Sequence, residues 1–219
     1  WFSSKRKPPK GAKTQKSVYV EGEHIKYTDG RNDFDIICVQ DMNLIGVHNY
    51  ENVCAAVAMC VAVGVPFDII INEVKHFKAV EHRIEYVATK NDVVYYNDSK
   101  GTNPDASIKA IKAMSRPTIL IGGGFDKGAN FDMYTAAFNP MIKLLVLMGQ
   151  TSEKIAQSAK QQGFENIVYA KDLEEVVHIC AAHAKPGDAV LLSPACASWD
   201  MFDNYEQRGR MFKEYVNLL

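Results

Sequence analysis

Residues 93–125, VVYYNDSKGTNPDASIKAIKAMSRPTILIGGGF, decide the fold class of this chain. An apolar stretch (93–97) leads into a polar turn, an amphipathic segment follows near 105–115, and a second apolar stretch (118–122) runs into glycines. Short apolar strands that are separated by helices indicate a parallel sheet with helices on both faces. Because such sheets bind ligands beyond the carboxyl ends of their strands, the residues that follow each strand are where chemistry is expected.

The same alternation continues to the end of the sequence. Further strands are expected at 144–148, 166–170 and 189–193, and further helices near 131–138, 152–163, 172–184 and 204–217. RIEYVAT and VVYYND flank Asn91-Asp92, which predicts a hairpin that adds an antiparallel edge strand. The fold class is therefore α/β, with a sheet of about five parallel strands and one antiparallel edge strand.

The first third of the sequence has a different pattern. VYVEG and HIKYTDG alternate around Gly22 like a short hairpin, and DIICVQDM is another expected strand. Residues 48–64, rich in Ala, Val, Met and Cys, predict a buried helix that is closed by Gly64, and FDIIINEVKHF predicts a second helix. A boundary is expected near 78–82, so that residues 1–80 and 81–219 form separate domains.

Composition restricts the classes of function. The chain has 47% apolar and 23% charged residues and a net charge of −1, so neither nucleic acid nor a membrane is an expected partner. The five cysteines form no CxxC pair, which favours reduced thiols in a cytoplasmic protein. Six basic residues lie within the first 16, where Pro8, Pro9 and Gly11 favour a solvated loop over a phosphate patch.

Polar side chains crowd the turn after the strand at 93–97. An N-cap explains Ser99 or Asn103, but it does not explain Asp98 and Lys100 at the mouth of a buried sheet. The next strand runs into GGGFDKG (122–128), where glycines would let N–H groups approach a ligand and Lys127 suits a carboxylate. The glycines match neither GxxxxGK[ST] nor GxGxxG, so a nucleotide-phosphate site is disfavoured, and a flexible turn is the alternative.

The last expected strand runs into SPACASWDMFDNYEQRG (193–209). Ser193, Ser198 and a helix that starts near Asp203 would present hydroxyls and free N–H groups to an anion. The structural alternative makes Asp203 an N-cap and Tyr205 a core residue. Because GxSxG is absent and no base neighbours Cys196, neither a serine triad nor a cysteine nucleophile is favoured.

HNYEN (48–52), then an Ala-rich helix, HRIE (82–85), NDSKGTNPDAS and GGGFDKG together resemble the Mur ligases over about residues 40–219. The segment 193–209 resembles their D-glutamate-adding members in particular. The resemblance implies that residues 1–80 end the family's central ATPase domain and that 81–219 form its Rossmann-like, amino-acid-binding C-terminal domain. The family's P-loop, UDP-sugar site, magnesium-binding glutamate and carbamylated lysine are then expected upstream of the printed residues.

The resemblance also implies roles for single residues. ATP contacts are implied for four positions: Asn49, Asn52, Arg83 and Asp98, the last of them at the ribose. D-Glutamate contacts are implied for four more: Thr102, Lys127, Ser198 and Tyr205, where Tyr205 stands at a position that is often Phe in the family. Lys100 and Lys127 are the expected catalytic groups. No metal ligand is expected, since His48 and the asparagines near it make a poor metal site.

The implied reaction is ATP-dependent ligation of D-glutamate to UDP-N-acetylmuramoyl-L-alanine in peptidoglycan synthesis, through an acyl phosphate. The implied cofactors are ATP and Mg2+, and the enzyme is expected to be a monomer. With these 219 residues alone, no activity is expected. Two alternatives stay open: a ligase of the same superfamily that adds another amino acid or adds glutamate to folate, and a non-catalytic Rossmann-like binding module. The Asn-Pro-Arg signature of diaminopimelate-adding relatives is absent.

Overall fold

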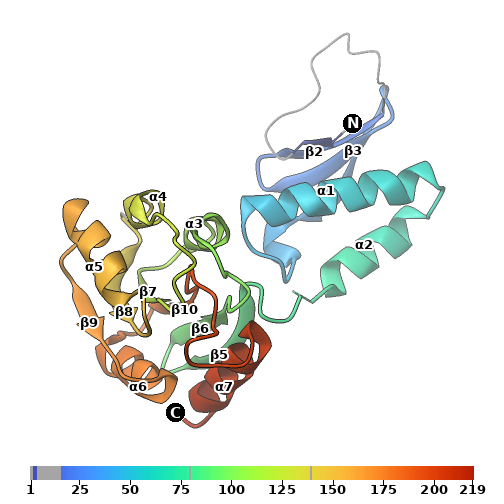
Figure 1. The fold of residues 1–219 in the computed structure, drawn as a ribbon. Helices are drawn as coiled ribbons and strands as arrows, with labels where there is room; N and C mark the ends of the chain where they lie inside the picture. Colours follow the sequence, from blue (N-terminus) through green and yellow to red (C-terminus); the bar gives the residue numbers. More distant parts are fainter. Residues whose placement is uncertain (1, 4–15, 79, 139) are drawn as a thin grey trace. The chain divides into compact units, whose positions relative to one another are not determined.

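The computed structural model describes residues 2–3, 16–78, 80–138 and 140–219. The chain divides into two compact units, residues 1–79 and 80–219, and each is described by itself (Figure 1). No helix among the described residues is both long and apolar enough to cross a membrane. Five of the six basic residues near the start, between 5 and 13, lie outside the described residues.

The first unit is a small sheet with two helices against it. Its strands follow the order β1-β2-β3-β4, with bounds Phe2–Ser3, Ser17–Glu21, His24–Thr28 and Asp33–Cys38. The hairpin expected around Gly22 is confirmed, since β2 and β3 pair antiparallel, whereas the strand β1 was not predicted. The expected strand DIICVQDM was only partly right, because the chain turns into a 3-10 helix at Val39–Asp41.

Helices α1 (Val47–Ala62) and α2 (Phe67–His76) cover this sheet. Gly64 closes α1 as predicted: at φ +83° it lies in the left-handed region, and Val65 N–H reaches back to the Cys60 carbonyl at 3.0 Å. The prediction of a buried helix was wrong for most of α1. Only one face packs on the sheet within the described residues, and Met59 on another face is 65% exposed.

The second unit confirms the predicted α/β fold. Its sheet has the order β5-β6-β10-β7-β8-β9, in which β5 is antiparallel and the other five strands are parallel. The strands are β5 (Glu85–Lys90), β6 (Val93–Asn97), β7 (Thr118–Gly122), β8 (Ile142–Leu147), β9 (Ile167–Tyr169) and β10 (Ala189–Leu192). The helices are α3 (Pro104–Lys112), α4 (Asp132–Ala136), α5 (Ser152–Gln161), α6 (Leu173–His183) and α7 (Tyr205–Asn217).

Helices cover both faces of this sheet (Figure 1). Helices α6 and α7 contact each other and share a core cluster with β6, β7, β8 and β10, while α3, α4 and α5 form a second contacting group. The predicted hairpin between β5 and β6 is confirmed, because Asn91 (φ +51°) and Asp92 (φ +60°) both adopt the left-handed conformation of a type I′ turn.

Candidate active site

The loops after β6, β7 and β10 meet at one edge of the sheet. Strand β10 pairs parallel with β6 on one side and with β7 on the other, so all three carboxyl ends point the same way. Asp98 follows β6, Lys127 follows β7 and Ser198 follows β10. Three predicted site residues therefore lie in the loops that follow adjacent strands, at the edge where such sheets bind ligands.

A buried arginine ties two of these loops together. Arg208 of α7 is fully buried; its Nε donates to the Ser99 hydroxyl at 2.9 Å, and its Nη2 donates to the carbonyls of Ser99 and Cys196 at 2.8 and 3.2 Å. Burial lowers the pKa of Arg208 to about 10, so the side chain still carries its charge at neutral pH. Sequence reasoning missed this residue. Its spacing from the buried Phe212 and Val216 was the available signal, because a charge on the apolar face of a helix needs partners.

Asp98 is held by hydrogen bonds inside the edge. The residue is 5% exposed, and its carboxylate accepts hydrogen bonds from the Ser193 hydroxyl at 2.7 Å and from Ile84 N–H at 3.3 Å. Burial raises the pKa of Asp98 to about 7, although these bonds and the nearby charges of Arg83 and Arg208 act in the opposite direction. The expectation that Ser193 presents its hydroxyl to a bound anion was wrong, because that hydroxyl donates its hydrogen bond to Asp98.

Arg83 lies in a strained turn next to Asp98. His82 (φ +64°) and Ile84 (φ +46°) are both left-handed, which is unusual for a residue with a Cβ and a true outlier for β-branched Ile. The side chain of Arg83 is exposed, and its charge acts on the Asp98 carboxylate. The structure thus brings together two of the residues predicted to contact ATP.

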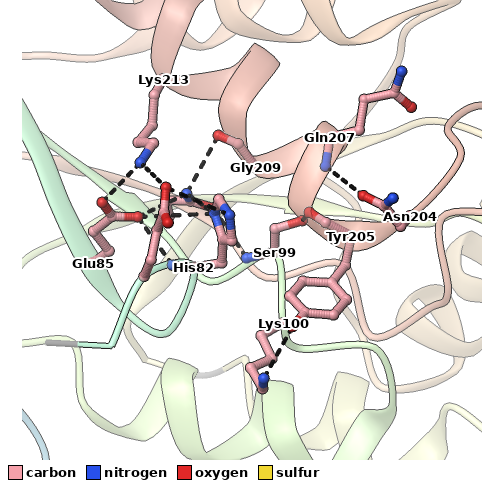
Figure 2. Close-up of polar contacts among 11 residues, drawn as sticks. His82, Glu85, Ser99, Lys100, Asn204, Tyr205, Gln207, Gly209 and Lys213 are labelled. Carbon is pink, nitrogen blue, oxygen red and sulfur yellow. Dashed lines mark hydrogen bonds and ion pairs between the residues drawn. The ribbon is translucent and has the colours of Figure 1, made fainter.

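Lys100 and Tyr205 form a pair beside Asp98. The Lys100 ammonium donates to the Tyr205 hydroxyl at 3.1 Å and lies 4.9 Å from the ring centroid (Figure 2). Tyr205 is the first residue of α7, and Asn204 is the N-cap, with its side chain accepting Gln207 N–H at 2.8 Å. The predicted N-cap at Asp203 was wrong by one residue.

The glycine loop after β7 is packed rather than open. The N–H groups of Gly123 and Phe125 donate to carbonyls of the 194–197 loop at 2.9 Å each, and Gly124 N–H donates to the Thr151 hydroxyl at 3.1 Å. A Cβ on Gly123 or Gly124 would clash with a backbone carbonyl oxygen. The prediction that these N–H groups approach a ligand was wrong, because the glycines let three loops pack closely and their donors are already used.

Thr102 and Lys127 line one small hollow at this edge, together with Phe125, Phe131 and Cys196. The Lys127 side chain is exposed, and its ammonium lies 5.5 Å from the ring centroid of Trp199. A half-buried hydroxyl and an ammonium that share a hollow can bind an anion such as a carboxylate.

Cys196, which lines this hollow, and Ser198, two residues further along the chain, are both buried. Ser198 is 2% exposed, and its hydroxyl has no hydrogen-bond partner among the described residues. Cys196 bonds the Thr151 hydroxyl at 3.2 Å, and burial raises the pKa of its thiol to about 11. The thiol is therefore protonated at neutral pH, in agreement with the expectation that Cys196 is no nucleophile.

The remaining predicted site residues, Asn49 and Asn52, lie on α1 of the first unit. Asn49 is buried and its amide donates to the Ile45 carbonyl at 2.8 Å, which is a structural contact. Asn52 is exposed and lines an apolar groove between α1 and α2. Of the two, Asn52 has the more accessible amide.

Glu81, His82 and Glu85 bring potential metal ligands together at the start of the second unit. Lys213 donates to both carboxylates, at 2.7 Å to Glu81 and 3.0 Å to Glu85. An ammonium between two carboxylates already neutralises them, so the arrangement fits an ion-pair network better than a cation site.

Comparison with known proteins finds relatives of this chain. The family model described as Mur ligase, glutamate ligase domain, matches residues 82–196, more than half of the chain. A relative from Lachnospira eligens, named UDP-N-acetylmuramoylalanine–D-glutamate ligase, is 69% identical over all of this chain and 47% of its own length. One of the same name from Clostridioides difficile is 45% identical, over 94% of this chain and 46% of its own. The chain spans about half the length of the curated relatives it matches.

Solved structures show the same fold. The UDP-N-acetylmuramate-alanine ligase of Thermotoga maritima aligns with a TM-score of 0.66 at 14% identity, over 92% of this chain and 46% of that one. The folylpolyglutamate synthase of the same organism aligns at 0.62 and 19%, over 93% and 47%. Identities this low show the fold alone. The family model, matched over more than half of these residues, shows that the chain belongs to the Mur ligase family.

Proposed function

We propose that this chain supplies the D-glutamate site and part of the ATP site of a ligase that joins D-glutamate to UDP-N-acetylmuramoyl-L-alanine. The observation that carries the proposal is the pairing of two sites at one sheet edge. Thr102 and Lys127 share a hollow suited to a carboxylate. The buried Asp98, with Arg83 beside it, follows β6, which is separated from the strand before Lys127, β7, by β10 alone. The names of the relatives support the same assignment.

The reaction needs a positioned amine more than it needs a protein nucleophile. ATP phosphorylates the L-alanine carboxylate, and the amine of D-glutamate then attacks the acyl phosphate, forms the amide bond and releases phosphate. Lys127 would pair with a carboxylate of D-glutamate, while Thr102 and Ser198 would offer hydroxyls to it. Lys100 is a second ammonium at the same edge, oriented by Tyr205, and would stabilise the negative charge of the reacting phosphate.

The nucleotide part of the site rests on a carboxylate and a guanidinium. Asp98 has accepting oxygens suited to the ribose hydroxyls, and the exposed Arg83 suits a phosphate or the face of a base. Asn52 would add an amide from α1, while Asn49 would position that helix. Mg2+ accompanies ATP in such reactions, and its main ligands are expected outside these residues.

The two units would then belong to different domains of the ligase. Residues 1–79 would end the ATP-binding domain, and residues 80–219 would form the amino-acid-binding domain. Two alternatives from the same superfamily compete with this proposal: ligation of a different amino acid, and addition of glutamate to folate, since a folylpolyglutamate synthase shares the fold.

The test is an assay of the complete enzyme for ATP-dependent phosphate release with UDP-N-acetylmuramoyl-L-alanine. D-Glutamate should support turnover, and L-glutamate should not. Turnover with L-glutamate and a folate acceptor would instead favour the synthase, and NAD(P) binding without turnover would favour a binding module. The 219 residues alone should release no phosphate above background.

A further inference from the structure

We propose that His82, packed against Gly209, is a positioning residue that holds the strained 82–84 turn so that Arg83 and Asp98 face one ligand. The inference rests on the proposed function, because that ligand is the nucleotide. His82 itself is buried, at 3% exposure, and does not reach the open edge. Its effect on the reaction must therefore pass through its neighbours in the chain.

The turn cannot hold its own conformation. A left-handed backbone is strained in a residue that has a Cβ, and the turn contains two such residues, His82 and Ile84. Such a backbone conformation persists only where contacts with the surrounding structure stabilise it. Relaxation of the turn would move Arg83, which lies between these two residues, and would withdraw the Ile84 N–H that donates to Asp98 at 3.3 Å.

Backbone and side-chain contacts of His82 hold the turn in this conformation (Figure 2). Its N–H donates to Glu85 at 3.0 Å, and its carbonyl accepts the N–H of Lys100 at 3.0 Å. The imidazole Nδ1 lies 2.9 Å from the Asn97 amide nitrogen. Because that nitrogen can only donate, Nδ1 is the acceptor and the ring carries its proton on Nε2. Burial lowers the pKa of His82, which keeps this neutral tautomer at neutral pH.

Gly209 makes the room for the ring. A Cβ at this position would come within 3.0 Å of three imidazole atoms. Gly209 lies in α7, and in a helix glycine is less favourable than alanine. Helix propensity therefore favours alanine at position 209, whereas packing against the imidazole requires glycine. On propensity alone Gly209→Ala should stabilise the helix, so a destabilised variant would report the contact with His82.

The two contacts can be separated by a cycle of variants in the complete ligase. Gly209→Ala pushes the ring out, His82→Gly removes the ring but tolerates the left-handed backbone, and the double variant relieves the clash without restoring the ring. His82→Asn is the conservative rescue, since asparagine also tolerates positive φ and its Oδ1 can accept from Asn97. Lys90→Ala serves as the matched control, because it removes a different tie to α7, at Asn217.

The expected results differ between stability and nucleotide binding. Gly209→Ala should lower the melting temperature, and the double variant should recover it. The KM for ATP should rise at least about fivefold in Gly209→Ala, in His82→Gly and in the double variant, with the KM for D-glutamate within about twofold. His82→Asn should recover most of the ATP affinity, and Lys90→Ala should leave both KM values unchanged.

Two results would overturn the inference. One is an unchanged KM for ATP in folded His82→Gly and Gly209→Ala proteins. The other is a parallel rise of the KM values for ATP and D-glutamate, which would mean a general structural role. Failure of the proposed function is distinguishable, because it would appear in the wild-type enzyme as an absence of D-glutamate ligation, while ATP binding by calorimetry and the stability cycle could still be measured.

Discussion

Asp98 and Lys127 follow two strands that flank β10, yet their surroundings are opposite. Asp98 is 5% exposed and accepts two hydrogen bonds from its own chain, in a network that reaches Ser193 and the strained turn at 82–84. Lys127 is exposed, and its described contact is with the face of an aromatic ring. One half of the edge is therefore organised before a ligand arrives, while the other half depends on the ligand for its charge pairing.

The largest expected effect is at Lys127, in the half of the edge that depends on the ligand for its charge pairing. Lys127→Ala should lower kcat/KM for D-glutamate at least about tenfold, because a charge-assisted contact in a water-poor site contributes about 1.5–3 kcal/mol. The melting temperature should stay near the wild-type value, since an exposed loop side chain contributes little to stability. Steady-state kinetics with D-glutamate varied at saturating ATP measure the effect.

Lys171→Ala is the matched control for this variant, because Lys171 is an exposed lysine of the same unit and its side chain is 77% exposed. It should behave like wild type in both assays. Wild-type kinetics in Lys127→Ala would remove the residue from the D-glutamate site, whereas a collapsed melting curve would show that it is structural.

At the organised half, a smaller effect is expected, and it depends on pH. Asp98→Ala should raise the KM for ATP about tenfold, with little change for D-glutamate. Arg83→Ala should change the KM for ATP in the same direction. In the wild type, the KM for ATP should rise as the pH falls below about 7, because the protonated carboxyl is a poorer acceptor for ribose hydroxyls. Asp98→Asn should lose this pH dependence, which separates it from titration of ATP itself.

The same pKa shift predicts the sign of a stability effect. Burial raises the folded-state pKa of Asp98 above its ordinary value of 3.8, to about 7, so ionisation is penalised in the folded protein. The stability that Asp98 contributes is complete below pH 4 and is lost as the pH rises through 7. Asp98→Asn should therefore melt above wild type at pH 8, by a margin that shrinks at pH 5. A margin that is constant across this range would contradict the burial of an ionisable carboxyl.

The contrast between the two halves also shows which features could be predicted from the sequence and which could not. The strands 93–97 and 118–122 were predicted to the residue, because apolar runs bounded by turns are a local signal. Arg208 and the pairing of His82 with Gly209 were missed, because their meaning depends on contacts across more than 100 residues. The glycines at 123–124 were misread for the same reason, since a packing glycine and a ligand-binding glycine have the same local sequence.

The smallest expected effect tests whether Lys127 is wholly unorganised. Trp199 is 62% exposed, and its ring packs on Phe125 with ring centroids 5.6 Å apart. The contact with Phe125 therefore holds the indole in place. A cation–π contact at an exposed site contributes about 0.5–1 kcal/mol, so Trp199→Leu should raise the KM for D-glutamate about two- to fivefold, while Trp199→Phe should retain most of the affinity.

Adding Trp199→Leu to Lys127→Ala should cause no further loss, because the ring would act only through the ammonium. Additive losses in this double variant would mean that the indole touches the substrate directly. A parallel rise in the KM for ATP would mean that the substitution disturbs the whole 194–200 loop. If instead the effect is confined to D-glutamate and vanishes without Lys127, the aromatic pair partly restrains the ammonium before the ligand binds, and the difference between the two halves is one of degree.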